Sequence, residues 1–272
     1  MTAALRRPAT RRSLDLGDLR VTYIPDGAVQ LVPDRWFPTT TAATWSEHSQ
    51  YVDASGHLVA SIGGLLIESG DRALLIDAGF GPQTWPAAPD APIGVVQGGT
   101  LLDNLGRDPR DIEAVAFTHL HVDHVGWASA FPAATYLIAE PEWAERHHAV
   151  ANGIDQQTLD TLQDRTKTVA DGNEIFPGVT VSLFPGHTAG HAAYVVQSGS
   201  QRLIAFGDAM HSSLQVTHPE WWAAPDHDRE QAMTQRRRLI DELRQPGTIG
   251  FGIHFADVQF GRVAAESTWE AL

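Results

Sequence analysis

The chain has 272 residues, with 33 acidic against 19 basic side chains and a formal net charge of −14. Its length can bury a substantial core, and an apolar fraction of 43% is typical of a globular protein rather than a disordered one. The acidic balance argues against nucleic acid or an anionic membrane surface as a partner, because both need a cationic face. The chain has no cysteine, which excludes disulfides and thiolate ligands. Any metal must therefore be held by histidine and carboxylate side chains.

The N-terminal segment is rich in arginine but lacks the apolar stretch of an export signal. Four arginines lie within the first twelve residues, and Asp15, Asp18 and Arg20 interrupt the apolar residues that follow. No window reaches the 18 or so apolar residues that a membrane span needs. We therefore expect a cytoplasmic protein with a flexible leader over residues 1–18 and a single domain over residues 19–272.

Short apolar runs and helical patterns alternate along the rest of the chain. Strands are expected, in chain order, at residues 19–24, 64–69, 73–78, 114–118, 135–139, 180–184, 192–197, 203–206 and 248–253. Helices are expected between them, at residues 100–106, 141–150, 154–165 and 229–243. This mixture predicts one α/β (α+β) domain with two sheet layers and outer helices.

Two stretches fit the alternation poorly, at residues 29–59 and 211–227. Both contain tryptophans, which argue against disorder, and long irregular segments in a compact domain are usually functional. We expect Trp36, Phe37, Trp221 and Trp222 to line a substrate pocket. Two alternatives stay open: these aromatic residues cover the edge of the core, or they form the interface of a homodimer.

Four ligand-type side chains occur within six positions, directly after the strand expected at 114–118. They are His119, His121, Asp123 and His124. His119 and His121 are two residues apart, so both rings point the same way if the strand geometry persists, and both can reach one cation. Imidazoles and a carboxylate packed this densely would be costly to bury without a cation. The run therefore predicts a metal site.

This His-x-His-x-Asp-His run resembles the signature of the metallo-β-lactamase superfamily. Four further segments, at residues 75–79, 185–191, 206–208 and 252–255, are similar to other motifs of that family. The resemblance covers about residues 19–262 and implies an αββα sandwich of two mixed β-sheets flanked by helices. It implies His119, His121 and His187 as ligands of one cation, Asp123, His124 and His254 as ligands of the other, and Asp208 as the bridge. It also suggests Asp77 as a carboxylate behind the ligands.

The resemblance further implies a hydrolytic mechanism with two divalent metal ions. Zinc is the first expectation for His and Asp ligands, and iron, manganese or cobalt are alternatives. A water shared between the cations would act as hydroxide, with Asp123 to orient it or take its proton. His211 stands where quorum-signal lactonases of the superfamily place a catalytic tyrosine, and it can hydrogen-bond a substrate oxygen or leaving group. His191 is expected to be structural or to support the ligands.

The segment 207–228 and the ending 254–262 resemble the subgroup of methyl parathion hydrolase and N-acyl homoserine lactonase relatives. This implies a small, neutral and fairly apolar ester or lactone as the substrate. A phosphotriesterase (organophosphate hydrolase)-like activity is the first alternative. An iron-dependent oxidoreductase, such as a persulfide dioxygenase, is the second, although those enzymes use one iron and this chain has a complete second ligand set.

Overall fold

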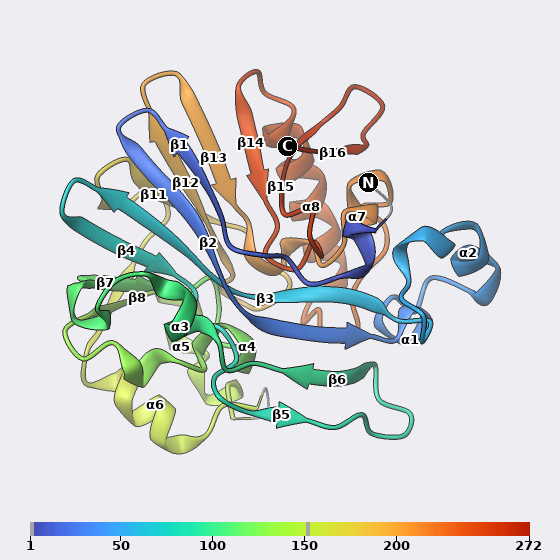
Figure 1. The fold of residues 1–272 in the computed structure, drawn as a ribbon, viewed down its shortest axis with the longest axis horizontal. Coiled ribbons are helices and arrows are strands. Elements are labelled where there is room, and N and C mark those ends of the chain that lie inside the picture. The colour runs from blue at the N-terminus through green and yellow to red at the C-terminus, as the bar shows by residue number, and fades with distance from the viewer. Residues whose placement is uncertain (1–2, 151–152) are drawn as a thin grey trace.

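Two mixed β-sheets face each other in the computed structural model, which describes residues 3–150 and 153–272. The first sheet has the order β5-β6-β2-β3-β4-β7-β8-β9, with β1 paired to β2, and the second runs from β10 to β16 in sequence order (Figure 1). The first comprises β1 (Arg12–Leu16), β2 (Leu19–Leu31), β3 (Leu58–Ser69), β4 (Arg72–Ile76), β5 (Thr84–Trp85), β6 (Ile93–Gln97), β7 (Ala114–Ala116), β8 (Thr135–Ala139) and β9 (Thr166–Val169). The second comprises β10 (Glu174–Phe176), β11 (Val179–Leu183), β12 (Ala192–Ser198), β13 (Gln201–Ala205), β14 (Thr248–Phe251), β15 (Phe260–Val263) and β16 (Trp269–Ala271).

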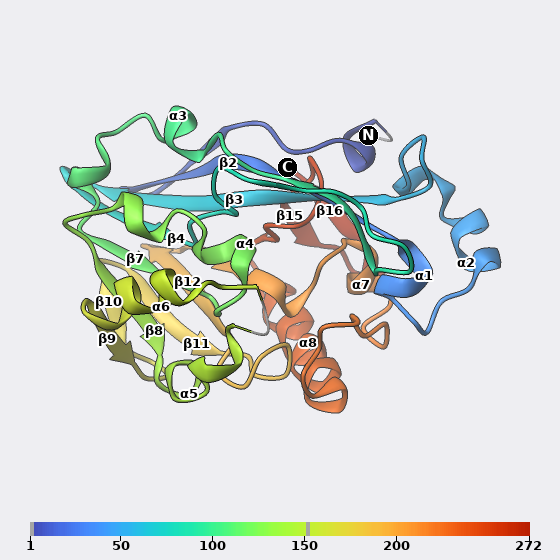
Figure 2. The same ribbon diagram turned by 90° about the horizontal axis from the view of Figure 1, so that it is seen from below.

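Helices lie outside the sheets, with α3 on one side and α8 on the other in Figure 2. They are α1 (Pro33–Trp36), α2 (Ala42–Glu47), α3 (Leu101–Leu105), α4 (Val122–Val125), α5 (Glu140–Ala144), α6 (Gln156–Gln163), α7 (Leu214–Thr217) and α8 (Arg229–Leu243). Leucines of α3 and α6 cover the first sheet, and Leu239, Ile240 and Leu243 of α8 cover the second. The arrangement confirms the predicted αββα sandwich.

The main core lies between the two sheets. Tyr23, Leu65 and Leu74 of the first sheet pack there against Tyr194 and Phe251 of the second. Strands such as β3 and β4 are covered by the second sheet on one face and by helices on the other. This explains why they appear in the sequence as continuous apolar runs rather than as alternating patterns.

The segment expected to be a flexible leader contains a strand, so that expectation is wrong for part of its length. β1 pairs antiparallel with β2, from Arg12 opposite Tyr23 to Leu16 opposite Leu19, and Leu16 is buried. Residues 1–2 of the leader lie outside the described residues. Most of the side chains of β1 are polar or partly exposed, so the charges that interrupt the apolar residues here also conceal an edge strand.

The irregular stretch expected at residues 29–59 is shorter than predicted. β2 continues to Leu31 and β3 already begins at Leu58, so the two strands pair over most of their length. Pro25, Asp26 and Gly27 look like a turn in the sequence, but the register shifts there and the strand continues past a bulge. The other expected strands occur with ends shifted by at most two residues.

Asp26 lies buried at this bulge and binds two loops to β2. Its carboxylate accepts six N–H groups, those of the Phe80, Gly81, Gly99, Thr100 and Leu101 backbone and of the Trp127 indole. These backbone groups flank the segment that forms β5 and β6. Both ends of the β5–β6 hairpin are therefore attached to one side chain.

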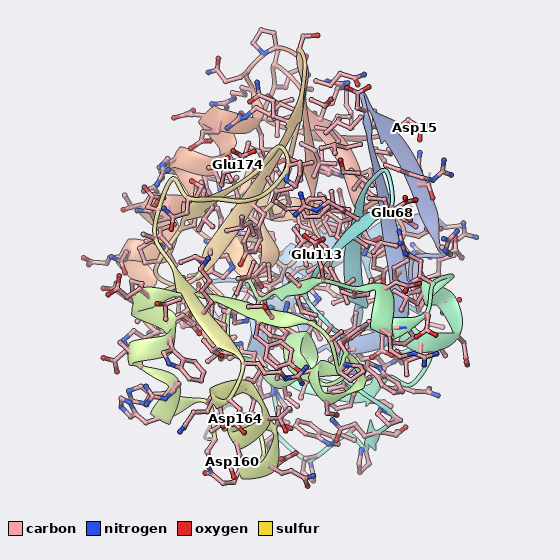
Figure 3. The ribbon with its side chains drawn as sticks, turned by 90° about the vertical axis from the view of Figure 1, so that its left-hand side faces the viewer. Asp15, Glu68, Glu113, Asp160, Asp164 and Glu174 are labelled. Atoms are coloured by element: carbon pink, nitrogen blue, oxygen red, sulfur yellow. The ribbon has the colours of Figure 1, made fainter. Side chains whose placement is uncertain are left out.

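Carboxylates are spread over the outside of the molecule, as the net charge requires. Figure 3 shows six of them on one face, Asp15, Glu68, Glu113, Asp160, Asp164 and Glu174. Some are paired, for example Glu113 with Arg72 and Glu68 with Arg107. Within residues 3–150 and 153–272, none of the helices combines the length and apolarity that crossing a bilayer requires.

Candidate metal centre

Loops that follow strands of both sheets bring all seven predicted ligands together. The first four lie between β7 and the end of α4, and the others follow β11, β13 and β14. Two groups of donor atoms result, each with its atoms within 4.8 Å of one another. The first group is His119, His121, His187 and Asp208, and the second group is Asp123, His124 and His254.

Asp208 stands between the two groups. Its Oδ1 lies 3.0 Å from Nε2 of His254 and 3.2 Å from Nε2 of His124. Its Oδ2 lies 3.4 Å from Nε2 of His187 and 3.7 Å from Nε2 of His119. Each carboxylate oxygen thus faces one group, which is the arrangement a bridging ligand needs.

Three of the donor atoms lack the hydrogen bonds that buried polar atoms normally make. His119 Nε2, His124 Nε2 and Asp208 Oδ1 are buried and have no hydrogen-bond partner among the described residues, although buried polar atoms are normally paired. Burial and the neighbouring His124 and His121 hold the pKa of His119 well below its ordinary value, which keeps its ring neutral and its lone pair available. Imidazole nitrogens and carboxylate oxygens suit zinc and related divalent ions. The residues present therefore fit a pair of such ions.

A carboxylate and an arginine stand behind the first group. Nδ1 of His187 lies 3.0 Å from Oδ1 of Asp226, and Oδ2 of Asp226 lies 3.4 Å from Nη2 of Arg236, with both side chains fully buried. We missed these contacts in the sequence, because 39 residues separate His187 from Asp226. One signal in the sequence could have pointed to Arg236. It has the helical spacing of Ala232 and Leu239, so a charged side chain falls on the apolar stripe of α8 and is expected to need a buried partner.

Asp77, which the sequence suggested as a carboxylate behind the ligands, lies behind the second group. Its Oδ2 is 2.9 Å from Nδ1 of His124, and its carboxylate accepts the N–H and the hydroxyl of Thr118. Asp77 itself has φ of 60°, a left-handed conformation that non-glycine residues rarely adopt outside constrained sites. The Ser61 carbonyl lies 2.8 Å from Nδ1 of His254. These partners fix the ring orientations of both histidines.

Glu142 connects the two loops that carry the predicted histidine ligands of the first group. Its carboxylate accepts the N–H of Leu120 at 2.8 Å, the hydroxyl of Thr188 at 2.6 Å and the N–H of Gly190 at 3.0 Å. His191 has a structural contact, because its Nε2 accepts the N–H of Asp208 at 3.0 Å. These bonds attach the ligand loops to α5 and to each other.

A pocket of about 320 Å³ opens on the two groups. Asp123, His211 and His254 lie at its polar end. Its apolar walls come mainly from β2, α1 and the β5–β6 hairpin, and consist of Val29, Leu31, Trp36, Ala60, Phe80, Trp85, Ile93, Val96, Val122 and Pro225. An apolar wall with a few convergent polar groups is typical of a small-molecule site.

Of the four aromatic residues expected to line the pocket, only Trp36 does so. Phe37 and Trp221 are buried and pack against Trp45, with ring centroids 6.2 and 5.6 Å apart. The guanidinium of Arg229 lies 3.7 Å from the ring centroid of Trp222. The expectation is therefore wrong for Phe37, Trp221 and Trp222, because the sequence does not show which aromatic residues fill the core. Trp85 lines the pocket and was missed.

His211 lies in the pocket wall beside the bridge. Its Nε2 is 3.1 Å from Oδ2 of Asp208, and its ring packs edge-on against Trp36 at 5.0 Å. Burial lowers the pKa of His211 to about 4, against the opposing effect of Asp208. Asp123 is the most exposed of the carboxylates here, with 23% of its side chain accessible.

Comparison with known proteins gives a family match over residues 65–246, to the Metallo-beta-lactamase superfamily. A probable metallo-hydrolase of Mycobacterium tuberculosis is 26% identical over 181 residues, which cover 54% of this chain and 56% of the relative. An N-acyl homoserine lactonase of Bacillus sp is 28% identical over 162 residues, which cover 59% of this chain and 63% of the relative. The chain thus spans less than two thirds of the length of these relatives.

Solved structures share the fold over nearly the whole chain. AidC, a dizinc quorum-quenching lactonase in complex with a product, has a TM-score of 0.79 at 21% identity, covering 97% of both chains. The hydrolase AbOPH has a TM-score of 0.79 at 22% identity, covering 98% of both chains. The family match includes six of the seven predicted ligands, all except His254. The chain belongs to the metallo-β-lactamase superfamily.

Proposed function

We propose that the protein is a dinuclear metal-dependent hydrolase that cleaves a neutral, fairly apolar ester or lactone. The observation that carries this proposal is the position of Asp208, whose two oxygens each face one group of histidines. The apolar pocket that opens on the same atoms supports the choice of substrate. The relatives named N-acyl homoserine lactonase favour a lactone.

The first group would hold one ion, the second group the other, and Asp208 would bridge them, with zinc as the first expectation. When bound, the two ions would supply a Lewis acid for the scissile carbonyl and an activated water as the nucleophile. Iron, manganese or cobalt are alternatives to zinc, because the same donor types bind them.

Residues of the chain would bind and orient the substrate. The walls at Trp36, Phe80 and Trp85 would bury its apolar part and exclude bulk water. Asp123, beside His254 and partly exposed to the pocket, would orient the attacking water or take its proton. His211, in the wall next to Asp208, would donate a hydrogen bond to a substrate oxygen or to the departing group.

A phosphotriesterase-like activity is the second candidate, because a neutral phosphotriester suits the same apolar pocket. An iron-dependent oxidoreductase with a single iron has less support, since it leaves the second group of Asp123, His124 and His254 without a role. A cytoplasmic location and a homodimer stay predictions.

A hydrolysis panel on zinc-loaded protein tests the proposal. It compares homoserine and larger lactones, aryl esters, phosphotriesters, glutathione thioesters and β-lactams, with elemental analysis of ions per chain. We expect two ions per chain, turnover of lactones or esters, and loss of turnover on chelation. Turnover by fully chelated protein, or activity confined to thioesters or β-lactams, would contradict the proposal.

A further inference from the structure

Arg236 is a fully buried arginine in the middle of α8. Its Nε donates to the carbonyl of Ala209 at 2.9 Å, and its Nη1 donates to the carbonyls of Pro219 and Trp221, both at 2.9 Å. A buried cation is costly unless it is paired and hydrogen-bonded. The fork of the guanidinium meets this demand by binding three carbonyls and one carboxylate, that of Asp226.

Asp226 connects this arginine to a predicted ligand. Its Oδ2 accepts the N–H of Ala223 at 2.9 Å and lies 3.4 Å from Nη2 of Arg236, while its Oδ1 is 3.0 Å from Nδ1 of His187. A hydrogen-bonded chain therefore runs from Arg236 through Asp226 to the ring of His187.

The same guanidinium also holds the segment that follows the bridging carboxylate. Ala209, whose carbonyl it binds, is the residue directly after Asp208. The carbonyl of Trp221 is shared between Arg236 and the buried Gln215, whose Oε1 in turn accepts the N–H of His211 at 2.6 Å. Arg236 thus contacts three groups beside the site. They are the carboxylate of Asp226, which holds His187, the carbonyl next to Asp208, and the Trp221 carbonyl that also binds Gln215, the partner of His211.

We propose that Arg236 is a positioning residue that, through Asp226 and the Ala209 carbonyl, fixes His187 and Asp208 relative to each other and thereby sets the affinity of the first group for its ion. Outer partners of ligating histidines typically change metal affinity by about 10- to 100-fold. Lysine cannot replace the fork, because a single ammonium cannot satisfy a carboxylate and three carbonyls in this planar geometry. The proposal rests on the proposed function only for the presence of an ion in the first group.

The test compares Arg236→Met and Arg236→Lys with the wild-type chain and with Arg237→Met. Arg237 is the next residue along the helix and is exposed, so it controls for loss of a charge from α8. Zinc affinity is measured by competition with a chromophoric chelator, and cobalt-loaded protein gives a visible spectrum that reports ligand geometry. We expect one of two ions to bind about 10- to 100-fold more weakly in both Arg236 variants, with an altered cobalt spectrum. Arg237→Met should leave both readouts unchanged.

A double variant, Asp226→Asn with Arg236→Met, separates positioning from folding. Removing one buried charge leaves the other unpaired, whereas removing both often restores stability. We expect the double variant to melt near the wild-type temperature and yet to bind the ion of the first group as weakly as Arg236→Met does. Wild-type affinity in the folded double variant, or in Arg236→Met, would overturn the proposal. A wild-type chain that binds only one ion would instead refute the dinuclear function, and the affinity of that ion would still test Arg236.

Discussion

The two groups of predicted ligands differ in what stands behind them. His187 of the first group is held by Asp226, which pairs with the buried Arg236 of α8. His124 of the second group is held by Asp77, whose partner Thr118 lies only six residues from His124. Behind the first group, the supporting carboxylate is thus paired with a buried arginine, whereas behind the second group it accepts hydrogen bonds from the backbone and hydroxyl of Thr118.

The groups are similar in their exposure, because each has one partly exposed member, His121 in the first and Asp123 in the second, while the others are buried. What differs is the support behind the histidines. The comparison therefore predicts that the two ions respond to different substitutions.

The largest effect is expected from Asp208→Ala, which removes the one side chain that both groups share. Each oxygen of Asp208 faces a different group, so the variant should lose at least one ion per chain and its hydrolytic activity. Elemental analysis and the hydrolysis panel measure both. Asp228→Asn is the control, because asparagine also caps a helix well and Asp228 only caps α8. Two retained ions in Asp208→Ala would show that the groups do not share a bridge.

Asp77→Asn should weaken the second group selectively. Asparagine tolerates the left-handed backbone of this position, so the substitution removes the charge behind His124 without adding strain. We expect the ion of the second group to bind about 10- to 100-fold more weakly, with the other ion unchanged. Stepwise chelator competition resolves the two ions. An equal loss of affinity for both ions would contradict the prediction that Asp77 supports only the second group.

Trp85→Ala tests the pocket that opens on the two groups. Each methylene buried in an apolar pocket is worth about 0.8 kcal/mol, or about fourfold in kcat/KM along a series of acyl chains. We expect this chain-length dependence to flatten in Trp85→Ala and to persist in Trp222→Ala, whose ring does not line the pocket. Ion affinity should stay unchanged in both. If kcat/KM depended on acyl-chain length equally in wild type and in Trp85→Ala, the substrate chain would not bind against Trp85.

The smallest effect is expected from Thr118→Val, which touches both groups. The hydroxyl of Thr118 lies 3.0 Å from Oδ2 of Asp77 and 3.0 Å from Nδ1 of His119. Loss of one hydrogen bond should weaken both ions by about 2- to 12-fold. The backbone N–H of Thr118 still reaches Asp77, which limits the effect. A change confined to one ion in the chelator titration would show that the hydroxyl serves only that group.

The sequence already indicated the seven residues that the fold brings together, four through their local spacing and three through motifs that resemble those of the family. Four of them lie within six positions, and His187, Asp208 and His254 each lie in a motif of their own. Of the residues behind them, the resemblance suggested Asp77, whereas Asp226, Arg236 and Glu142 could not be predicted in the same way. Asp226 is 39 positions from His187, and Glu142 is 22 positions from Leu120. Nothing near either carboxylate in the sequence distinguishes it from a surface carboxylate.

The pocket shows a similar limit. Aromatic residues in an irregular segment can fill a core or face a ligand, and only the packing of Trp45 against Phe37 and Trp221 decides which. The fold itself was easier, because strands buried on both faces leave unbroken apolar runs. Several strands were not predicted: β1, β5, β6, β9, β10, β15, β16 and the continuation of β2. Of these, β1 and the continuation of β2 carry polar or turn-forming residues whose role depends on pairing with a neighbour.

Asp26 has a consequence for how this scaffold can be altered. Because its carboxylate binds the chain on both sides of β5 and β6, the two ends of the β5–β6 hairpin are fixed in place. Trp85, Ile93 and Val96 of this hairpin line the pocket, yet the hairpin contributes none of the seven predicted ligands. We expect that its length and composition can be exchanged to select other substrates while the metal centre stays intact.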